Sequence, residues 1–107
     1  MNNKDFAELV GVVIDKISSM TLSKGTEYAG QDLDRLSAFK RAGIAKGKIP
    51  EEVLQGYVLK HDTSIDDMVK EVAAGLPVRP WLVWEEKIMD RIIYNILLLA
   101  LVSDRNK

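Results

Sequence analysis

The sequence contains no cysteine, a single histidine and only three prolines among its 107 residues. The absence of cysteine excludes disulfide bonds, thiolate nucleophiles and cysteine-ligated zinc. A basic excess is also missing, because 15 lysines and arginines are balanced by 16 aspartates and glutamates, for a net charge of −1. Nucleic-acid-binding domains usually carry a clear basic excess, so nucleic acid is not an expected partner.

Long hydrophobic runs are absent as well. The most apolar stretch, residues 92–102, is shorter than the roughly 20 apolar residues of a membrane helix, so no membrane partner is expected. The N-terminal sequence MNNKDFAELVGVV has acidic residues before a short apolar run and no small-residue cleavage site, which is not typical of a secretory signal. We therefore expect a cytoplasmic protein.

The overall composition, 47% hydrophobic and 29% charged, is typical of a globular protein. A chain of this length makes about one small domain, so we predict a single helical domain over residues 1–107. Its stability margin is expected to be small, because small domains bury a smaller fraction of their unfolded surface than large ones.

Apolar residues at helical spacing predict four helices and no strands. The first covers residues 4–20, and its predicted inward stripe is Phe6, Leu9, Val10, Val13, Ile17 and Met20. Residues 21–31 lack an apolar period and contain two glycines, which predicts a loop. A second helix is expected from Leu33 to about Lys46, with Asp32 as its N-cap and Gly47 at its end.

The third helix is expected to begin at Pro50, where proline suits the first turn, and to end at Gly75. Its predicted inward stripe is Val53, Leu54, Tyr57, Val58, Ile65, Met68, Val69 and Val72. A proline-bounded connector at residues 76–80 leads to a fourth helix from about Trp81 to Ser103. Four helices with short connections predict an all-α, compact bundle.

The last helix is apolar on every side from Ile92 to Val102, except at Asn95. A helix that is apolar all round is normally packed by neighbours on several sides. Since one small chain offers few neighbours, we predict that homo-oligomerisation, as a homodimer or a higher oligomer, completes the bundle.

The third helix contains a polar row formed by Lys60, His61, Ser64 and Asp67. His61 falls on the predicted inward stripe, four residues after Tyr57. It is either a core histidine satisfied by a neighbour or part of a ligand-facing row.

The fourth helix offers a second polar cluster, Glu86, Lys87, Asp90 and Tyr94. Asp90 stands just before the apolar run, so it must be paired, bound to a metal or open to a cavity. Glu86 and Asp90, one turn apart, could hold Mg²⁺ with waters, or they could form an acidic patch with a salt bridge to Lys87 or Arg91.

The predicted loop contributes a third cluster, Lys24, Glu27 and Tyr28, followed by Arg35. Glycine beside lysine and threonine suits phosphate binding, but the second glycine and the Lys-Ser/Thr ending of a P-loop are missing. An ordinary surface loop is the alternative.

The order of the motifs KGTEYAGQDLDRLSAFKRA, LKHDTSIDDMV and EEKIMDRIIYNILLLALV resembles a family of small phage-encoded helical proteins of unassigned function. The resemblance covers roughly residues 22–102. That family is in turn similar to the all-α, MazG-like nucleotide pyrophosphohydrolases, which hold Mg²⁺ and a nucleoside triphosphate with an ExxE helix and an ExxD helix. The resemblance implies a host-cell cytoplasmic location and a nucleotide-like ligand.

The sequence departs from the enzyme pattern in its acidic residues. The first half contains no ExxE pair, and Glu86 and Asp90 are four residues apart rather than three. We therefore expect a protein that binds a nucleotide-like, phosphate-containing ligand without a cofactor, and that sequesters a nucleotide signal of bacterial immunity. The alternatives are a Mg²⁺-dependent nucleoside triphosphate pyrophosphohydrolase with Glu86 and Asp90 as metal ligands, and a protein–protein inhibitor of a host factor. The expected ligand-binding residues are Lys24, Glu27, Tyr28, Arg35, Lys60, His61, Ser64, Asp67, Glu86, Lys87, Asp90 and Tyr94.

Overall fold

The structure is a computed structural model that describes the backbone of residues 1–29 and 36–107 and the side chains of residues 1–21 and 36–107. In this part of the chain the regular elements are four helices, with no strand, which confirms the predicted all-α bundle. The helices are α1 (Asn3–Ala29), α2 (Ser37–Lys46), α3 (Pro50–Ala73) and α4 (Trp81–Arg105).

The chain divides into two compact units, residues 1–37 and residues 38–107. The first contains α1, and the second contains α3, α4 and all of α2 except its first residue. The single domain over residues 1–107 stays a prediction. No helix in the described residues is both long enough and apolar enough to cross a membrane.

Helix α1 is longer than expected. It begins where the Asn2 side chain accepts a hydrogen bond from the Asp5 backbone N–H at 2.8 Å. The predicted loop at residues 21–31 is wrong as far as Ala29, because the helix continues through this segment. Thr21 turns its hydroxyl back to donate to the carbonyl of Ile17, which satisfies this polar group without ending the helix. The predicted N-cap Asp32 and helix start at Leu33 lie outside the described residues.

A tight turn joins α2 to α3. Gly47 has a φ of 66°, the left-handed conformation that favours glycine, and it ends α2 as predicted. The Lys48 N–H donates to the carbonyl of Gly43 at 2.9 Å, which folds the chain back onto α2. Helix α3 then begins at Pro50, and the Glu52 carboxylate accepts a hydrogen bond from the Ile49 N–H at 3.4 Å.

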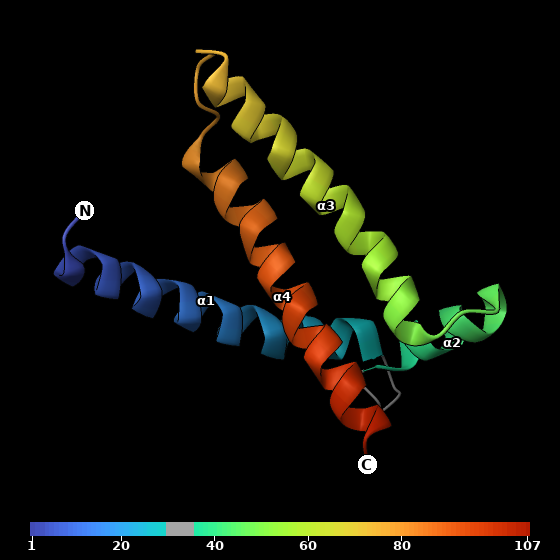
Figure 1. Cartoon of the computed structure of the whole chain (residues 1–107). Helices are drawn as coiled ribbons and strands as arrows, with labels where there is room; N and C mark the ends of the chain where they lie inside the picture. The colour runs from blue at the N-terminus through green and yellow to red at the C-terminus, as the bar shows by residue number, and fades with distance from the viewer. Residues whose placement is uncertain (30–35) are drawn as a thin grey trace. The chain divides into compact units, whose positions relative to one another are not determined.

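Helices α3 and α4 run antiparallel and pack against each other along their lengths (Figure 1). Gly75, with a φ of 79°, ends α3 as predicted and leads into the connector. The buried side chains between the helices are Val53, Leu54, Ile65, Met68, Met89, Ile93 and Leu101. This core is narrower than the predicted stripe of α3, because Tyr57, Val69 and Val72 are exposed.

Candidate functional site

The central contact of the candidate site joins α3 to α4. The Lys87 ammonium group on α4 donates a hydrogen bond to the Ser64 hydroxyl on α3, with 2.9 Å between Nζ and Oγ. Both side chains are partly buried. Among the described residues no carboxylate forms an ion pair with Lys87. This cation therefore lies at a helix interface with a neutral partner, where it is able to attract an anion.

An aromatic pair lies along the same interface. The rings of His61 and Tyr94 have their centroids 5.1 Å apart and are tilted by 55°. His61 is three residues before Ser64, and Tyr94 is seven residues after Lys87, so each pair of residues shares a helix face. The register of the two helices thus brings His61, Ser64, Lys87 and Tyr94 into one polar strip, which we call the α3–α4 strip.

Two acidic residues belong to the neighbourhood of the α3–α4 strip. Asp90 is half-buried, one turn from both Lys87 and Tyr94, and Glu86 is exposed. Among the described residues there is no group of three or more histidine, aspartate or glutamate side chains that could hold a metal ion. Glu86 and Asp90 alone supply two of the ligands that a hydrated Mg²⁺ would need.

The remaining predicted site residues lie elsewhere or outside the described part. Lys60 is exposed on α3, and Asp67 is exposed near the connector, where its charge helps to raise the pKa of Arg79. The side chains of Lys24, Glu27, Tyr28 and Arg35 are outside the described residues, although the first three of these positions lie within α1 rather than in a loop.

Sequence reasoning missed one ion pair next to the α3–α4 strip. Asp62, which would be expected on a solvated acidic face, lies 3.4 Å from Arg91, measured from Oδ1 to Nε. Both side chains are close to half exposed, so the pair contributes little to stability. The pair lies between the His61–Tyr94 and Lys87–Ser64 contacts, so it depends on the antiparallel register of α3 and α4, for which the sequence has no local signal.

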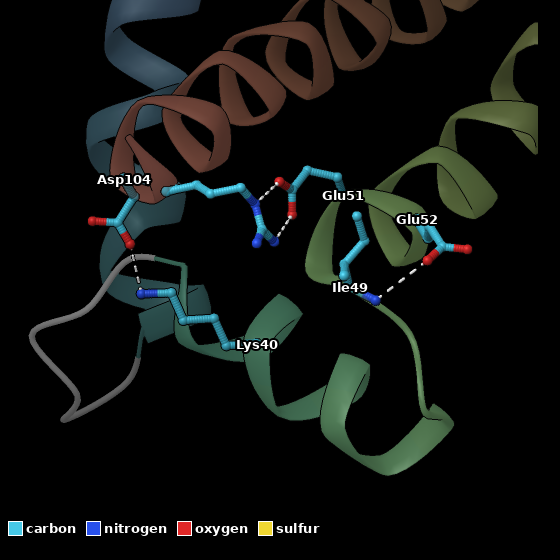
Figure 2. Close-up of polar contacts among 6 residues, drawn as sticks. Lys40, Ile49, Glu51, Glu52 and Asp104 are labelled. Carbon is cyan, nitrogen blue, oxygen red and sulfur yellow. Dashed lines mark hydrogen bonds and ion pairs between the residues drawn. The ribbon is translucent and has the colours of Figure 1, made fainter. Parts of the chain in front are cut away.

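The strongest electrostatic contact lies at the other end of the helix pair (Figure 2). Arg105 donates two hydrogen bonds to the Glu51 carboxylate, at 2.6 and 2.9 Å, and Lys40 is 2.8 Å from Asp104. The bidentate hydrogen bond from Arg105 lowers the pKa of Glu51 to about 2. These pairs tie α2, α3 and the end of α4 together, so we assign them a structural role.

A shallow hollow of about 440 Å³ lies between α2 and the start of α3. Its lining includes Lys40, Ile44, Lys48, Ile49 and Glu52. None of the predicted site residues lines it, and its apolar side chains Ile44 and Ile49 are open to solvent. The hollow and the α3–α4 strip are therefore different places on the same unit.

Comparison with protein-family models, with curated proteins and with solved structures finds no match to this chain.

Proposed function

We propose that the α3–α4 strip binds a small, phosphate-bearing, nucleotide-like molecule. The observation that supports this most directly is the Lys87–Ser64 contact, since it places an ammonium group and a hydroxyl side by side. An ammonium group binds phosphate as a point charge, and the hydroxyl can donate to the same oxygens. The phosphate of the ligand would occupy this end of the strip.

The other end of the strip suits the rest of a nucleotide. His61 and Tyr94 present two neighbouring rings, and a nucleobase gains about 1–3 kcal/mol when it stacks on an aromatic side chain. Asp90, on α4 between Lys87 and Tyr94 in the sequence, is placed to accept hydrogen bonds from ribose hydroxyls. The spacing of these groups follows the order phosphate, sugar and base.

The small number of acidic residues near the α3–α4 strip favours binding without hydrolysis of the ligand. A hydrolase of nucleoside triphosphates normally surrounds Mg²⁺ with several carboxylates and phosphate oxygens. Glu86 and Asp90 supply one such pair, so we propose a protein that retains its ligand unchanged. The resemblance to phage-encoded proteins adds the ligand class, a nucleotide signal of bacterial immunity that the protein sequesters in the host cytoplasm.

Titration with defined nucleotides tests the proposal. Isothermal titration of the whole protein should detect binding of at least one member of a panel of mononucleotides, dinucleotides and cyclic oligonucleotides. Lys87→Met should weaken that binding by about 10- to 100-fold, because a charge-assisted hydrogen bond contributes about 1.5–3 kcal/mol. Lys70→Met is the matched control, since Lys70 is an exposed lysine of α3 away from the strip, and it should bind as the wild type does.

Three results would contradict the proposal. Equal affinities of the wild type and a folded Lys87→Met variant would remove the α3–α4 strip from binding. Release of pyrophosphate that requires Mg²⁺ and is lost in Asp90→Asn would establish the pyrophosphohydrolase instead. Binding of none of the nucleotides, together with a stable complex with a host protein, would establish the protein–protein inhibitor.

A further inference from the structure

Helix α4 has a second apolar face, on the side opposite the core that it shares with α3. The core side carries Met89, Ile93 and Leu101. From Ile88 to Val102 the other face carries residues at alternating spacings of three and four, the spacing at which one helix contacts another over a long distance. We call this face the α4 seam, and its members are Trp81, Ile88, Ile92, Asn95, Leu99 and Val102.

The α4 seam is open to solvent along most of its length. Trp81 is 62% exposed and Leu99 is 71% exposed, while Ile88 and Val102 are about two-fifths exposed. From Trp81 to Val102 the seam extends for about 30 Å, at roughly 1.5 Å per helical residue. Between Ile88 and Val102 this surface is apolar except at Asn95, and an exposed apolar face of this kind is typical of a protein–protein interface.

The outer apolar residues Ile88 and Val102 are symmetric about Asn95. Ile88 and Val102 each lie seven residues from Asn95, and Ile92 and Leu99 lie three and four residues from it. In a twofold dimer a residue on the axis meets its own copy, and residues equally far on either side meet each other. An antiparallel second α4 centred on Asn95 therefore places Ile88 opposite Val102 of the second copy, while Ile92 and Leu99 lie between these positions and Asn95.

The polar residues of this face fit the same arrangement. Two Asn95 amides on the axis can donate to and accept from each other, and a single buried asparagine of this kind fixes the register of a helix pair. An antiparallel pair also keeps the Glu85 side chains of the two copies apart and opposes the two helix dipoles. A parallel pair would instead place Glu85 against its own copy and align the two helix dipoles.

We propose that the α4 seam is the interface with a second copy of this chain, in an antiparallel, twofold arrangement centred on Asn95. The occupant is a second copy because Ile88, Asn95 and Val102 are complementary to the same residues of another chain under this rotation. The seam and the α3–α4 strip are different faces of the helix, so this inference does not depend on the ligand.

The first test measures the mass of the protein in solution, for the wild type and for variants of α4. Light scattering of the full chain at about 100 µM should give twice 12.0 kDa, and Leu99→Glu should reduce that mass to one chain while the helical circular dichroism is unchanged. Leu82→Glu is the matched control, since Leu82 is 72% exposed on α4 and is not part of the seam; it should leave the mass unchanged. A monomeric wild type, or a Leu99→Glu variant with the wild-type mass, would overturn the proposal.

Cross-linking tests the direction of the helices, and the absence of native cysteine makes it specific. With a short bismaleimide, Asn95→Cys should cross-link to its own copy. Ile88→Cys alone should cross-link poorly, because antiparallel helices separate the two copies by about 20 Å at roughly 1.5 Å per residue. An equal mixture of Ile88→Cys and Val102→Cys should cross-link efficiently. Efficient cross-linking of Ile88→Cys alone, with no gain in the mixture, would overturn the antiparallel arrangement.

Discussion

Gly43 and Gly56 are glycines inside two helices of the same compact unit, yet their surroundings differ. A Cβ atom added at Gly43 would lie 2.6 Å from the Lys48 carbonyl oxygen, while one added at Gly56 would have nothing within 4 Å. The close approach at Gly43 allows the chain to turn back after α2 through the hydrogen bond from Lys48. Only the first glycine is therefore required by packing.

Alanine substitution should separate these two roles. Gly43→Ala must move backbone atoms of the turn, so we expect a loss of about 1–3 kcal/mol in the free energy of unfolding. Gly56→Ala should raise the free energy of unfolding by about 0.5–1 kcal/mol, because alanine is the better helix former at an open position. Chemical denaturation of both variants measures the two signs, and equal effects would contradict this account of the turn.

Glu51 is a carboxyl group whose pKa is strongly lowered in the folded protein. Its carboxylate accepts two hydrogen bonds from Arg105, which lower its pKa from 4.5 to about 2. A carboxyl group with a lowered pKa in the folded state stabilises that state at every pH above the unfolded value. This stabilisation is lost as the pH falls from about 4.5 towards about 2.

Because the pKa of Glu51 is lowered in the folded state, the protein should become less stable in acid. The melting temperature of the wild type should fall between about pH 4.5 and pH 2, and in Glu51→Gln that fall should be smaller because the titrating group is gone. The lowered pKa of Glu71, which is paired with Arg79, adds to the fall in both proteins. Asp66→Asn is the control, since it removes an exposed acid of α3 and should keep the wild-type slope. A Glu51→Gln variant with that same slope would exclude the ion pair as its cause.

At the scale of the elements, the α3–α4 pair carries the described core. Leu54 is fully buried and Met68 is 1% exposed, whereas Leu59 on the same helix is 67% exposed. These three side chains are of comparable size, so burial is the main difference between them. Their substitution therefore tests whether the contact between α3 and α4 stabilises the fold.

We expect Leu54→Ala and Met68→Ala each to lower the free energy of unfolding by about 2–5 kcal/mol, through lost burial and the cavity that remains. Leu59→Ala should change it by about 0.5 kcal/mol or less. Urea denaturation followed by circular dichroism measures all three variants. If Leu59→Ala cost as much as Met68→Ala, the two helices could not pack in the described register.

The elements also show which features of the fold were predictable. The ends of α3 followed from local chemistry, because Pro50 and Gly75 each have a conformation that sets a helix boundary. The continuation of α1 to Ala29 did not follow, since glycine and threonine lower helix propensity without forbidding a helix, as the hydroxyl of Thr21 demonstrates.

The sequence predicted which residues share a helix face, but it did not predict the contacts between the helices. Helical spacing placed His61 and Ser64 on one face, but their partners depend on the register of α3 against α4. No local pattern in the sequence encodes that register. For this reason the pairing of Lys87 with Ser64, rather than with an acidic residue, required the structure.

At the scale of the whole molecule, α4 carries two proposed functions on two faces. The α3–α4 strip is the proposed ligand site and the α4 seam is the proposed interface with a second copy. A dimer that formed through the seam would contain two strips, one from each chain, so ligand binding should have a stoichiometry of one molecule per chain. Titration calorimetry with any nucleotide that binds gives this number directly, and one ligand per two chains would require a site shared between the copies.

The central claim is that the α3–α4 strip retains a phosphate-bearing small molecule. The most direct test is mass spectrometry of the small molecules that purified protein captures from a bacterial metabolite extract and releases on denaturation. The wild type should release an intact phosphorylated nucleotide-like molecule, also after prolonged incubation with Mg²⁺, and Lys87→Met should release far less of it than Lys70→Met. The same small-molecule profile from the wild type and a folded Lys87→Met variant would contradict the claim.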